Sequence, residues 1–423
     1  MKQYFYSAID FLVQIETKIA FYPTILSLGG LVFALVMTYF ESQGVSKYLV
    51  DHAPVLVVNN VDTARNLLTT FIGGLISIMV FSFTMVMIVL NQASSNYSPR
   101  VLPGLISNKR HQVILGIYNA CLLYCIFTLV SIEPTGNQYQ LPGFSVLLAI
   151  IFMTVCLGAF IYFIHSISQE IQINVILDRI FSKAKERLTA LIDDENKQVT
   201  EFPKTDGWKA IKSKRSGYFQ NISLNALSNF SKEHKVRFHV VPIKGVYLQK
   251  GDELLKYEKE LDEETVEKLY SAFLFSRSQL IETNYILAFK QITEVAVKAM
   301  SPGINDPGTA INAIDYLSEL FLLRMQKNDN SFYLNEDKEP IISMSSVGFD
   351  ALLYNAMAAL RTYCKHDIIL VQKLFGMLQR LRTTENCKVE SYRKAVENEM
   401  SRLKEDADQS IENSSDLKLI EFF

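Results

Sequence analysis

The feature that most constrains this chain is an uncharged apolar run at residues 67–90. A helix needs roughly 20 predominantly apolar residues to cross the hydrocarbon core of a bilayer, and this run is long enough. Residues 23–40, 113–132 and 144–164 pass the same test. None of them contains Asp, Glu, Lys or Arg, which each cost about 2.5–3.5 kcal/mol at the centre of an inserting helix. The sequence therefore predicts four transmembrane helices.

The rest of the chain predicts a water-soluble region, because no later run is both long and uncharged. The expected fold class is a mainly α membrane protein, with four transmembrane helices followed by a cytoplasmic α+β region. Apolar residues at helical spacing near the N-terminus fit an interfacial helix or a frayed lead-in. The expected segments are an N-terminal helix (1–22), a transmembrane domain (23–165), a stem helix and linker (166–206), a small β-rich module (207–260), a helical domain (261–405) and a flexible tail (406–423).

The boundaries of the soluble segments follow from periodicity. After the fourth span, apolar residues continue at helical spacing to about Ile192, which predicts one long stem helix and, through it, a homo-oligomer. Short β-branched and aromatic runs between Gly217 and Lys256 predict strands, with a helix at residues 224–234. From Glu263 onward the period is helical again, apart from a polar loop at 326–340.

The distribution of basic residues predicts the orientation in the membrane. Arg100, Lys109 and Arg110 lie between spans two and three, whereas the loop between spans three and four has no basic residue. Under the positive-inside rule, both termini and the soluble region are cytoplasmic. The lipid bilayer is thus the first expected partner.

The second span carries a polar stripe with a seven-residue repeat. In a membrane such a stripe must face protein or water, so it forms either a close seam between helices or the wall of a hydrated path. The cytoplasmic end is the more polar one, which favours the path. Arg100, just beyond it, either anchors to lipid phosphate at the surface or closes a pore. The pore or stripe candidates are Thr70, Ser77, Thr84, Asn91, Ser95, Ser98 and Arg100.

A second candidate site surrounds the loop at residues 300–309. Asp306 followed by Pro307 fits a helix N-cap with proline at the first helical position. The loop is therefore either a tight structural connection or a ligand, ion or gating site. The pocket candidates are Glu294, Lys298, Ser301, Asn305, Asp306, Thr309, Asn312 and Asp315.

Two motifs and a short run between them resemble a known family. The motifs are LNQASSNYSPRVL at residues 90–102 and AMSPGINDPGTA at 299–310, with RSGY at 215–218 between them. Together they resemble the bacterial predicted membrane proteins called DUF2254, over nearly the whole chain. The resemblance implies the membrane topology and a bacterial inner membrane, but no activity.

Motifs for catalysis are absent from the sequence. It has six histidines but no His-x-x-x-His, no Gly-x-Ser-x-Gly, no P-loop and no dinucleotide fingerprint. We therefore expect no enzyme, cofactor, metal or nucleic-acid partner. The expected function is channel-like or transport-related, with a small ion or ligand acting on a regulatory cytoplasmic domain. The alternative is a membrane-anchored ligand sensor or scaffold without conduction.

Overall fold

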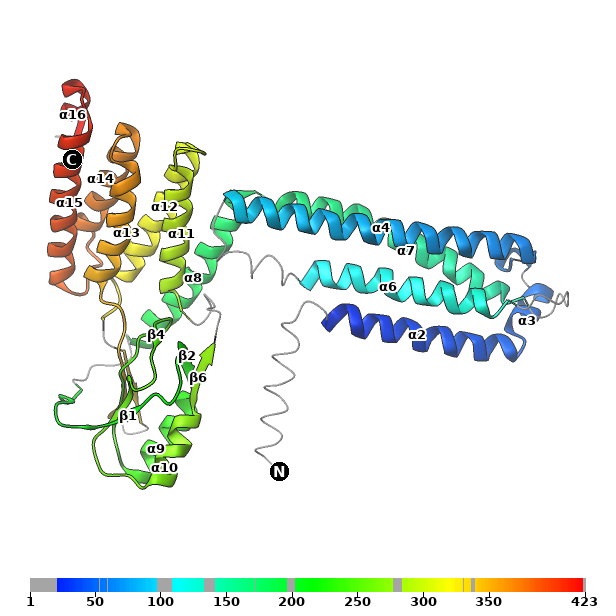
Figure 1. Cartoon of the computed structure of the whole chain (residues 1–423), viewed down its shortest axis with the longest axis horizontal. Helices are drawn as coiled ribbons and strands as arrows, with labels where there is room; N and C mark the ends of the chain where they lie inside the picture. The colour runs from blue at the N-terminus through cyan, green and yellow to red at the C-terminus, as the bar shows by residue number, and fades with distance from the viewer. Residues whose placement is uncertain are drawn as a thin grey trace. The chain divides into compact units, whose positions relative to one another are not determined.

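A computed structural model describes residues 21–52, 54–58, 60–96, 109–132, 141–170, 172–195, 202–276, 284–329, 331–335 and 339–420. The chain forms two compact units (Figure 1). The N-terminal unit contains the described helices up to residue 170, and the C-terminal unit runs from Ile173 onward. The expected N-terminal helix lies almost wholly outside the described residues, as do Ser98 and Arg100.

The N-terminal unit confirms the prediction of four membrane-length helices. They are α2 (Phe21–Ser42), α4 (Val61–Asn96), α6 (Lys109–Val130) and α7 (Gly143–Glu170), and each is long and apolar enough to cross a membrane. Two short elements, α3 (Val45–His52) and the 3-10 helix η1 (Pro54–Leu56), follow α2. The mainly α fold class with a mixed C-terminal region is likewise confirmed.

Glycines allow α2 and α6 to approach closely. A Cβ added to Gly30 would lie 2.6 Å from the backbone of Ala120, and one added to Gly116 would lie 2.5 Å from Leu26. Small residues at such crossings let helix backbones meet, which is a main source of helix association in membranes. Of the Gly-Gly pair in the first span, Gly30 therefore contributes to packing, whereas nothing lies within 4 Å of Gly29.

The carboxylate of Glu41 joins the end of α2 to the start of α7. Its Oε1 accepts hydrogen bonds from the backbone N–H and the hydroxyl of Ser145, both at 2.8 Å. Its Oε2 accepts one from Ser46 at 2.5 Å, and the Ser46 hydroxyl accepts the backbone N–H of Phe144. The free N–H groups of the α7 N-terminus are thereby satisfied by a negative charge, which the helix dipole favours.

The C-terminal unit begins with α8 (Ile173–Glu195), which packs against α11 (Ile286–Ala299) and α12 (Pro307–Arg324). The expected unbroken stem helix is wrong, because α7 ends at Glu170 and Gln172 is not helical. No proline or glycine lies at this break. The break therefore has no signal in the local sequence.

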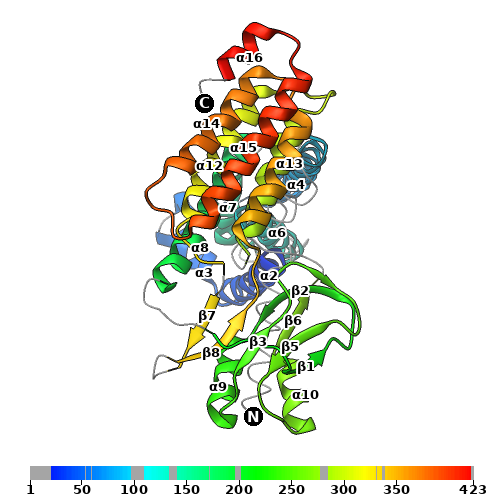
Figure 2. The same cartoon turned by 90° about the vertical axis from the view of Figure 1, so that its left-hand side faces the viewer.

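Two sheets occupy one end of the C-terminal unit (Figure 2). The larger sheet has the order β1-β5-β3-β8-β7 and the smaller one β4-β2-β6. All pairs are antiparallel except β3 with β8. The bounds are β1 (Lys209–Lys212), β2 (Gly217–Ile222), β3 (Phe238–Val240), β4 (Tyr247–Leu248), β5 (Glu253–Tyr257), β6 (Phe273–Ser276), β7 (Ser331–Leu334) and β8 (Pro340–Met344).

The sheet differs from the expected β-module in where its strands come from. The helix at residues 224–234 is confirmed as α9 (Leu224–His234). The polar loop expected at 326–340 instead contains β7 and leads into β8, which adds two strands to the larger sheet. The helical pattern expected from Glu263 onward is interrupted early: α10 (Glu263–Ser271) ends, and β6 follows because its residues pair with β2. Long-range pairing overrides the local pattern in both places.

The other end of the unit is a helical bundle (Figure 2). After α11 and α12 it contains α13 (Phe349–Cys364), α14 (Ile368–Thr383), α15 (Glu390–Ser410) and α16 (Ser414–Ile420). The residues expected to form a tail thus include the end of α15 and all of α16, whose Ile420 is buried. The predicted cap is confirmed, because Asp306 accepts the N–H of Thr309 and Pro307 begins α12.

Candidate functional site

A small cavity lies inside the C-terminal unit, where the sheets meet the helices. Its volume is about 70 Å³. Its walls come from α8, the turn between β3 and β4, the start of α11, the segment after α12 and the end of β8. The polar residues lining it include Arg187, Lys244, Asn284, Tyr285, Lys327 and Ser346.

Asn284 fixes two of these walls to each other. It is 8% exposed, and its Nδ2 donates to the carbonyl of Lys244 at 3.1 Å. Its Oδ1 accepts the N–H of Ile286, the first residue of α11, at 3.2 Å. The turn that carries Lys244 has Gly245 at φ 84°, a conformation that glycine adopts without strain. The amide of Asn284 therefore holds the Lys244 turn beside the N-terminus of α11.

The cavity carries positive charge without a matching negative charge. Arg187 of α8 and Lys244 both line it, and each is partly buried. Burial, together with the nearby charge of Arg187, lowers the pKa of Lys244 to about 8. No carboxylate forms an ion pair with either residue in the described part of the chain. The N-terminus of α11 adds partial positive charge to the same wall.

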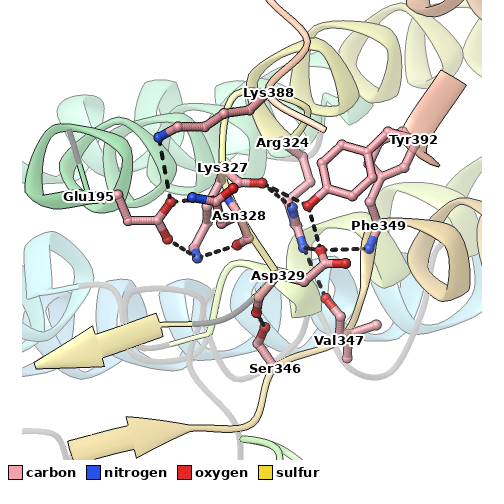
Figure 3. Close-up of polar contacts among 10 residues, drawn as sticks. All are labelled: Glu195, Arg324, Lys327, Asn328, Asp329, Ser346, Val347, Phe349, Lys388 and Tyr392. Atoms are coloured by element: carbon pink, nitrogen blue, oxygen red, sulfur yellow. Dashed lines mark hydrogen bonds and ion pairs between the residues drawn. The ribbon is translucent and has the colours of Figure 1, made fainter. Parts of the chain in front are cut away.

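Lys327 is the third basic group of the cavity, and it is already paired. It is 1% exposed. Its Nζ donates to Oε1 of Glu195, at the end of α8, and to the carbonyl of Asn328 at 2.9 Å (Figure 3). Burial lowers the pKa of Lys327, while the charge of Glu195 opposes that shift. Glu195 Oε2 also accepts the backbone N–H of Asn328 at 2.9 Å and lies 4.0 Å from the Nζ of Lys388.

A second ion pair, between the buried Arg324 and the partly exposed Asp329, holds the same segment (Figure 3). Arg324 is fully buried and donates to Asp329 Oδ1 at 2.5 Å, to the carbonyl of Lys327 at 2.9 Å and to that of Val347 at 3.1 Å. Burial disfavours the guanidinium charge, but neighbouring acceptors outweigh burial, and the pKa of Arg324 is raised. The hydroxyl of Tyr392 donates to the same Asp329 oxygen at 2.9 Å. The 324–329 segment is therefore held rigidly at the cavity wall.

Tyr285 places a buried hydroxyl between the cavity and this ion pair. Its side chain is 6% exposed and lines the cavity, and its hydroxyl makes no hydrogen bond within the described structure. Burial raises its pKa, and the nearby charge of Arg324 opposes that shift. A buried hydroxyl without a partner costs free energy. The Tyr285 hydroxyl is therefore available to hydrogen bond with a ligand in the cavity.

The predicted polar stripe lies on the outer face of α4. Thr70, Ser77, Thr84 and Asn91 are all exposed. The three hydroxyls each donate to the carbonyl four residues earlier, at 2.7, 2.9 and 2.8 Å, so they are satisfied by their own helix. A different seven-residue row faces the other helices of the unit: Leu68, Leu75, Ser82 and Val89. Ser95 lies in the last turn of α4.

The predicted pocket residues do not line the cavity described above. Asp306 is bound to the N–H and hydroxyl of Thr309, which lowers its pKa, and Ser301 donates to the carbonyl of Lys298. Asn305 adopts a left-handed conformation, with φ 48°. The remaining candidates lie on the two flanking helices: Glu294 on α11 is partly buried, Asn312 donates to Asn174 at 3.1 Å, and Asp315 pairs with Lys373 at 2.6 Å.

Sequence reasoning missed most of the cavity. Arg187, Lys244 and Lys327 are ordinary basic residues on three separate elements. A faint signal was available at 324–329, where Arg, Lys and Asp lie close together between a helix and a strand. Charges at such a junction are often paired with one another.

Comparisons with known proteins identify a family but no activity. The family model described as "Predicted membrane protein (DUF2254)" matches residues 16–380. Two similar relatives are an uncharacterised protein of Mycobacterium tuberculosis, MT1328, and one of Mycobacterium bovis, Mb1321c. Each is 22% identical over 379 residues, covering 84% of this chain and 70% of the relative. No solved structure matches the chain. The chain therefore belongs to the DUF2254 family of predicted membrane proteins.

Proposed function

We propose that this chain is a bacterial inner-membrane protein whose C-terminal unit faces the cytoplasm and binds a small anion in the cationic cavity. The cytoplasmic placement rests on the basic residues of the 100–110 segment and of α8. The observation that carries the proposal is that Arg187 and Lys244 both line the cavity. No carboxylate among the described residues forms an ion pair with either of them. Binding, with no chemical step, is sufficient for a sensor.

The size of the cavity fits a compact oxyanion. A water needs about 10–15 Å³ of such volume, so a cavity of about 70 Å³ holds about five water-sized atoms. A sulfate or phosphate group has five heavy atoms. Backbone N–H groups at a helix N-terminus and lysine or arginine side chains are the usual ligands of such groups.

The proposal is tested by isothermal titration of the purified full-length protein in detergent with sodium sulfate, whose charge does not change near neutral pH. We expect saturable binding that Lys244→Gln weakens at least tenfold. The matched control is Lys250→Gln, which removes an exposed lysine near the same turn. Wild-type protein that binds neither sulfate nor phosphate contradicts the proposal.

A second candidate function is conduction between copies of the chain. On α4 the row facing the other helices is apolar apart from Ser82, and the polar stripe lies on the opposite, exposed face, so a path along this stripe would run outside one four-helix unit. The hydroxyls of Thr70, Ser77 and Thr84 point outward. A polar path would therefore need α4 helices from several copies, which makes a homo-oligomer part of this candidate.

The conduction candidate is tested by ion flux from liposomes that contain the full-length protein. Ser77→Leu combined with Thr84→Leu should abolish flux while assembly remains intact. The control is Thr154→Leu on α7, an exposed hydroxyl with the same bond to its own helix. Equal flux in wild type and the double variant, or no flux at all, contradicts conduction through this face.

A further inference from the structure

We propose that Lys244 is a site of carbon dioxide addition: its side-chain amine forms a carbamate, and the guanidinium of Arg187 stabilises the negative charge of this product. Both residues line the cavity, one from the turn between β3 and β4 and the other from α8. No carboxylate among the described residues forms an ion pair with either of them. The inference goes beyond the anion site proposed above, because it assigns a covalent modification and does not require sulfate binding.

The neighbouring charge of Arg187 makes Lys244 a nucleophile. Two cations beside each other without a counter-charge favour the loss of a proton, and a buried lysine can lose its proton whereas an arginine stays charged. Burial and the charge of Arg187 lower the pKa of Lys244 to about 8, so about a tenth of this amine is neutral at pH 7. A lysine amine beside another cationic group is one of the usual activated nucleophiles of proteins.

The other titratable groups around the cavity do not oppose a negative product. Besides Arg187 and Lys244, the groups that line it are Tyr285, Lys327 and Tyr333. Burial raises the pKa of Tyr285, so this phenol stays neutral. The carboxylate of Glu195 is already bound to Lys327. A carbamate on Lys244 therefore meets the positive charge of Arg187 and no unpaired carboxylate among the described residues that line the cavity.

The reaction needs no oxidant or reductant. The lone pair of the Lys244 Nζ attacks the carbon of carbon dioxide and forms an N–C bond. The electron pair of one C=O bond moves onto its oxygen, and one proton of the amine leaves to solvent. The cavity of about 70 Å³ holds about five water-sized atoms, so it has room for the three atoms that are added.

The charge of the cavity favours carbon dioxide over an aldehyde or ketone as the electrophile. An imine formed with a carbonyl compound is basic, and its protonated form would place a positive charge beside Arg187 again. A carbamate instead replaces the lysine cation with an anion, so the interaction with Arg187 changes from repulsion to attraction. Arg187 thus both favours the reactive amine and stabilises its product.

The inference is tested by equilibrating the full-length protein in detergent with carbon-13 bicarbonate, which supplies labelled carbon dioxide. Alkylation with triethyloxonium then converts a carbamate into a stable ester, and peptide mass spectrometry locates it, which distinguishes a covalent group from bound bicarbonate. Lys250, exposed near the same turn, is the control within the same digest. Labelled adduct at Lys244 should exceed that at Lys250 at least about tenfold, because the neutral fraction of a lysine grows about tenfold for each unit by which its pKa falls.

Arg187→Gln tests the role of the neighbouring charge. It removes both the repulsion that favours the neutral amine and the attraction that stabilises the carbamate, so adduct at Lys244 should fall about tenfold. The matched control is Lys185→Gln, which removes an exposed positive charge from the same helix and should leave the adduct unchanged. Adduct at Lys244 that is no higher than at Lys250, or equal adduct in Arg187→Gln and wild type, overturns the inference.

The two proposals for this cavity fail separately. Protein that binds sulfate but carries no adduct at Lys244 overturns the carbamate and leaves the anion site in place. Adduct at Lys244 in a protein that does not bind sulfate supports the carbamate and contradicts the anion site.

Discussion

Replacing Asp329 with alanine should strongly destabilise the C-terminal unit. Its Oδ1 accepts hydrogen bonds from Arg324 at 2.5 Å, from the hydroxyl of Tyr392 at 2.9 Å and from the N–H of Phe349 at 3.0 Å. Without the carboxylate, the fully buried guanidinium keeps only two carbonyl acceptors, those of Lys327 and Val347. Removing one partner of a buried ion pair costs about 3–5 kcal/mol.

The Asp329 side chain is 38% exposed, so water can reach the vacated position and the cost should lie near the lower limit, about 3 kcal/mol. With a urea dependence of about 3 kcal/mol per molar for a unit of this size, the unfolding midpoint should fall by about 1 M. Asp329→Asn keeps an acceptor and loses the charge. It should cost roughly half as much, because a charged hydrogen bond is about twice as strong as a neutral one.

The chain offers a direct probe for this measurement. Trp208 is its only tryptophan, and it precedes β1 in the C-terminal unit. Its ring lies 5.9 Å from that of Phe202, which stacks on Phe332 of β7 at 5.7 Å. Urea unfolding of the full-length protein in detergent is therefore followed by Trp208 fluorescence. An Asp329→Ala midpoint within about 0.2 M of wild type, or a loss no larger than that of Asp329→Asn, refutes the reasoning.

Three further predictions concern the membrane unit and the cavity. Gly30→Val should lower the yield of folded protein in detergent, measured by size exclusion, because its Cβ would lie 2.6 Å from Ala120, while Gly29→Ala should not, since nothing lies within 4 Å of that position. Glu41→Ala should lower the thermal midpoint by removing about 1–2 kcal/mol of capping at α7; an unchanged midpoint contradicts the capping role. Sulfate affinity should fall as pH rises through about 8, because Lys244 then loses its proton, and Lys244→Gln should be insensitive to pH.

The same pKa sets the sign of a stability effect. The pKa of Lys244 is lower in the folded protein than in the unfolded chain, where it has its ordinary value near 10.5. Between these two values the unfolded chain binds more protons, so this group makes the protein more stable as pH rises through that window. Ligand affinity and this contribution to stability should therefore change in opposite directions above pH 8. Parallel changes would contradict the assignment to Lys244.

The four spans could be predicted because an uncharged run of sufficient length has few other uses in a protein. The seven-residue repeat of Thr70, Ser77 and Thr84 could also be predicted from the sequence. Whether these side chains face the other helices or the outside could not. Periodicity finds the rows of a helix, and packing decides which one faces inward. Here Leu68 and Leu75 face the other helices, while the hydroxyls are satisfied by carbonyls of their own turn.

The larger sheet shows a second limit of local patterns. The short strands near Phe238 and Leu255 have β-branched and aromatic residues, and the sequence predicts them. The parallel partner of β3 is β8, whose Ile342 is paired with Phe238 across about a hundred intervening residues. The polar stretch at 326–340 hides β7, whose place in the sheet is set by pairing with β8. In β8 itself, Ile341, Ile342 and Met344 are buried in the core.

The candidate site could be predicted least. Arg187 and Lys244 are common surface residue types, and their role in a site depends on several distant elements that meet around one cavity. The Asp306 cap was predictable because it needs only neighbouring residues, and the structure confirms it. Local chemistry can thus be inferred from sequence, whereas the convergence of distant charges requires the fold.

The most direct test of the account is the sulfate titration of full-length wild type against Lys244→Gln, with Lys250→Gln as the control. The account predicts one saturable site in wild type, at least tenfold weaker binding in Lys244→Gln, and unchanged binding in Lys250→Gln. Equal binding in all three proteins, or none in wild type, would contradict an anion site in this cavity.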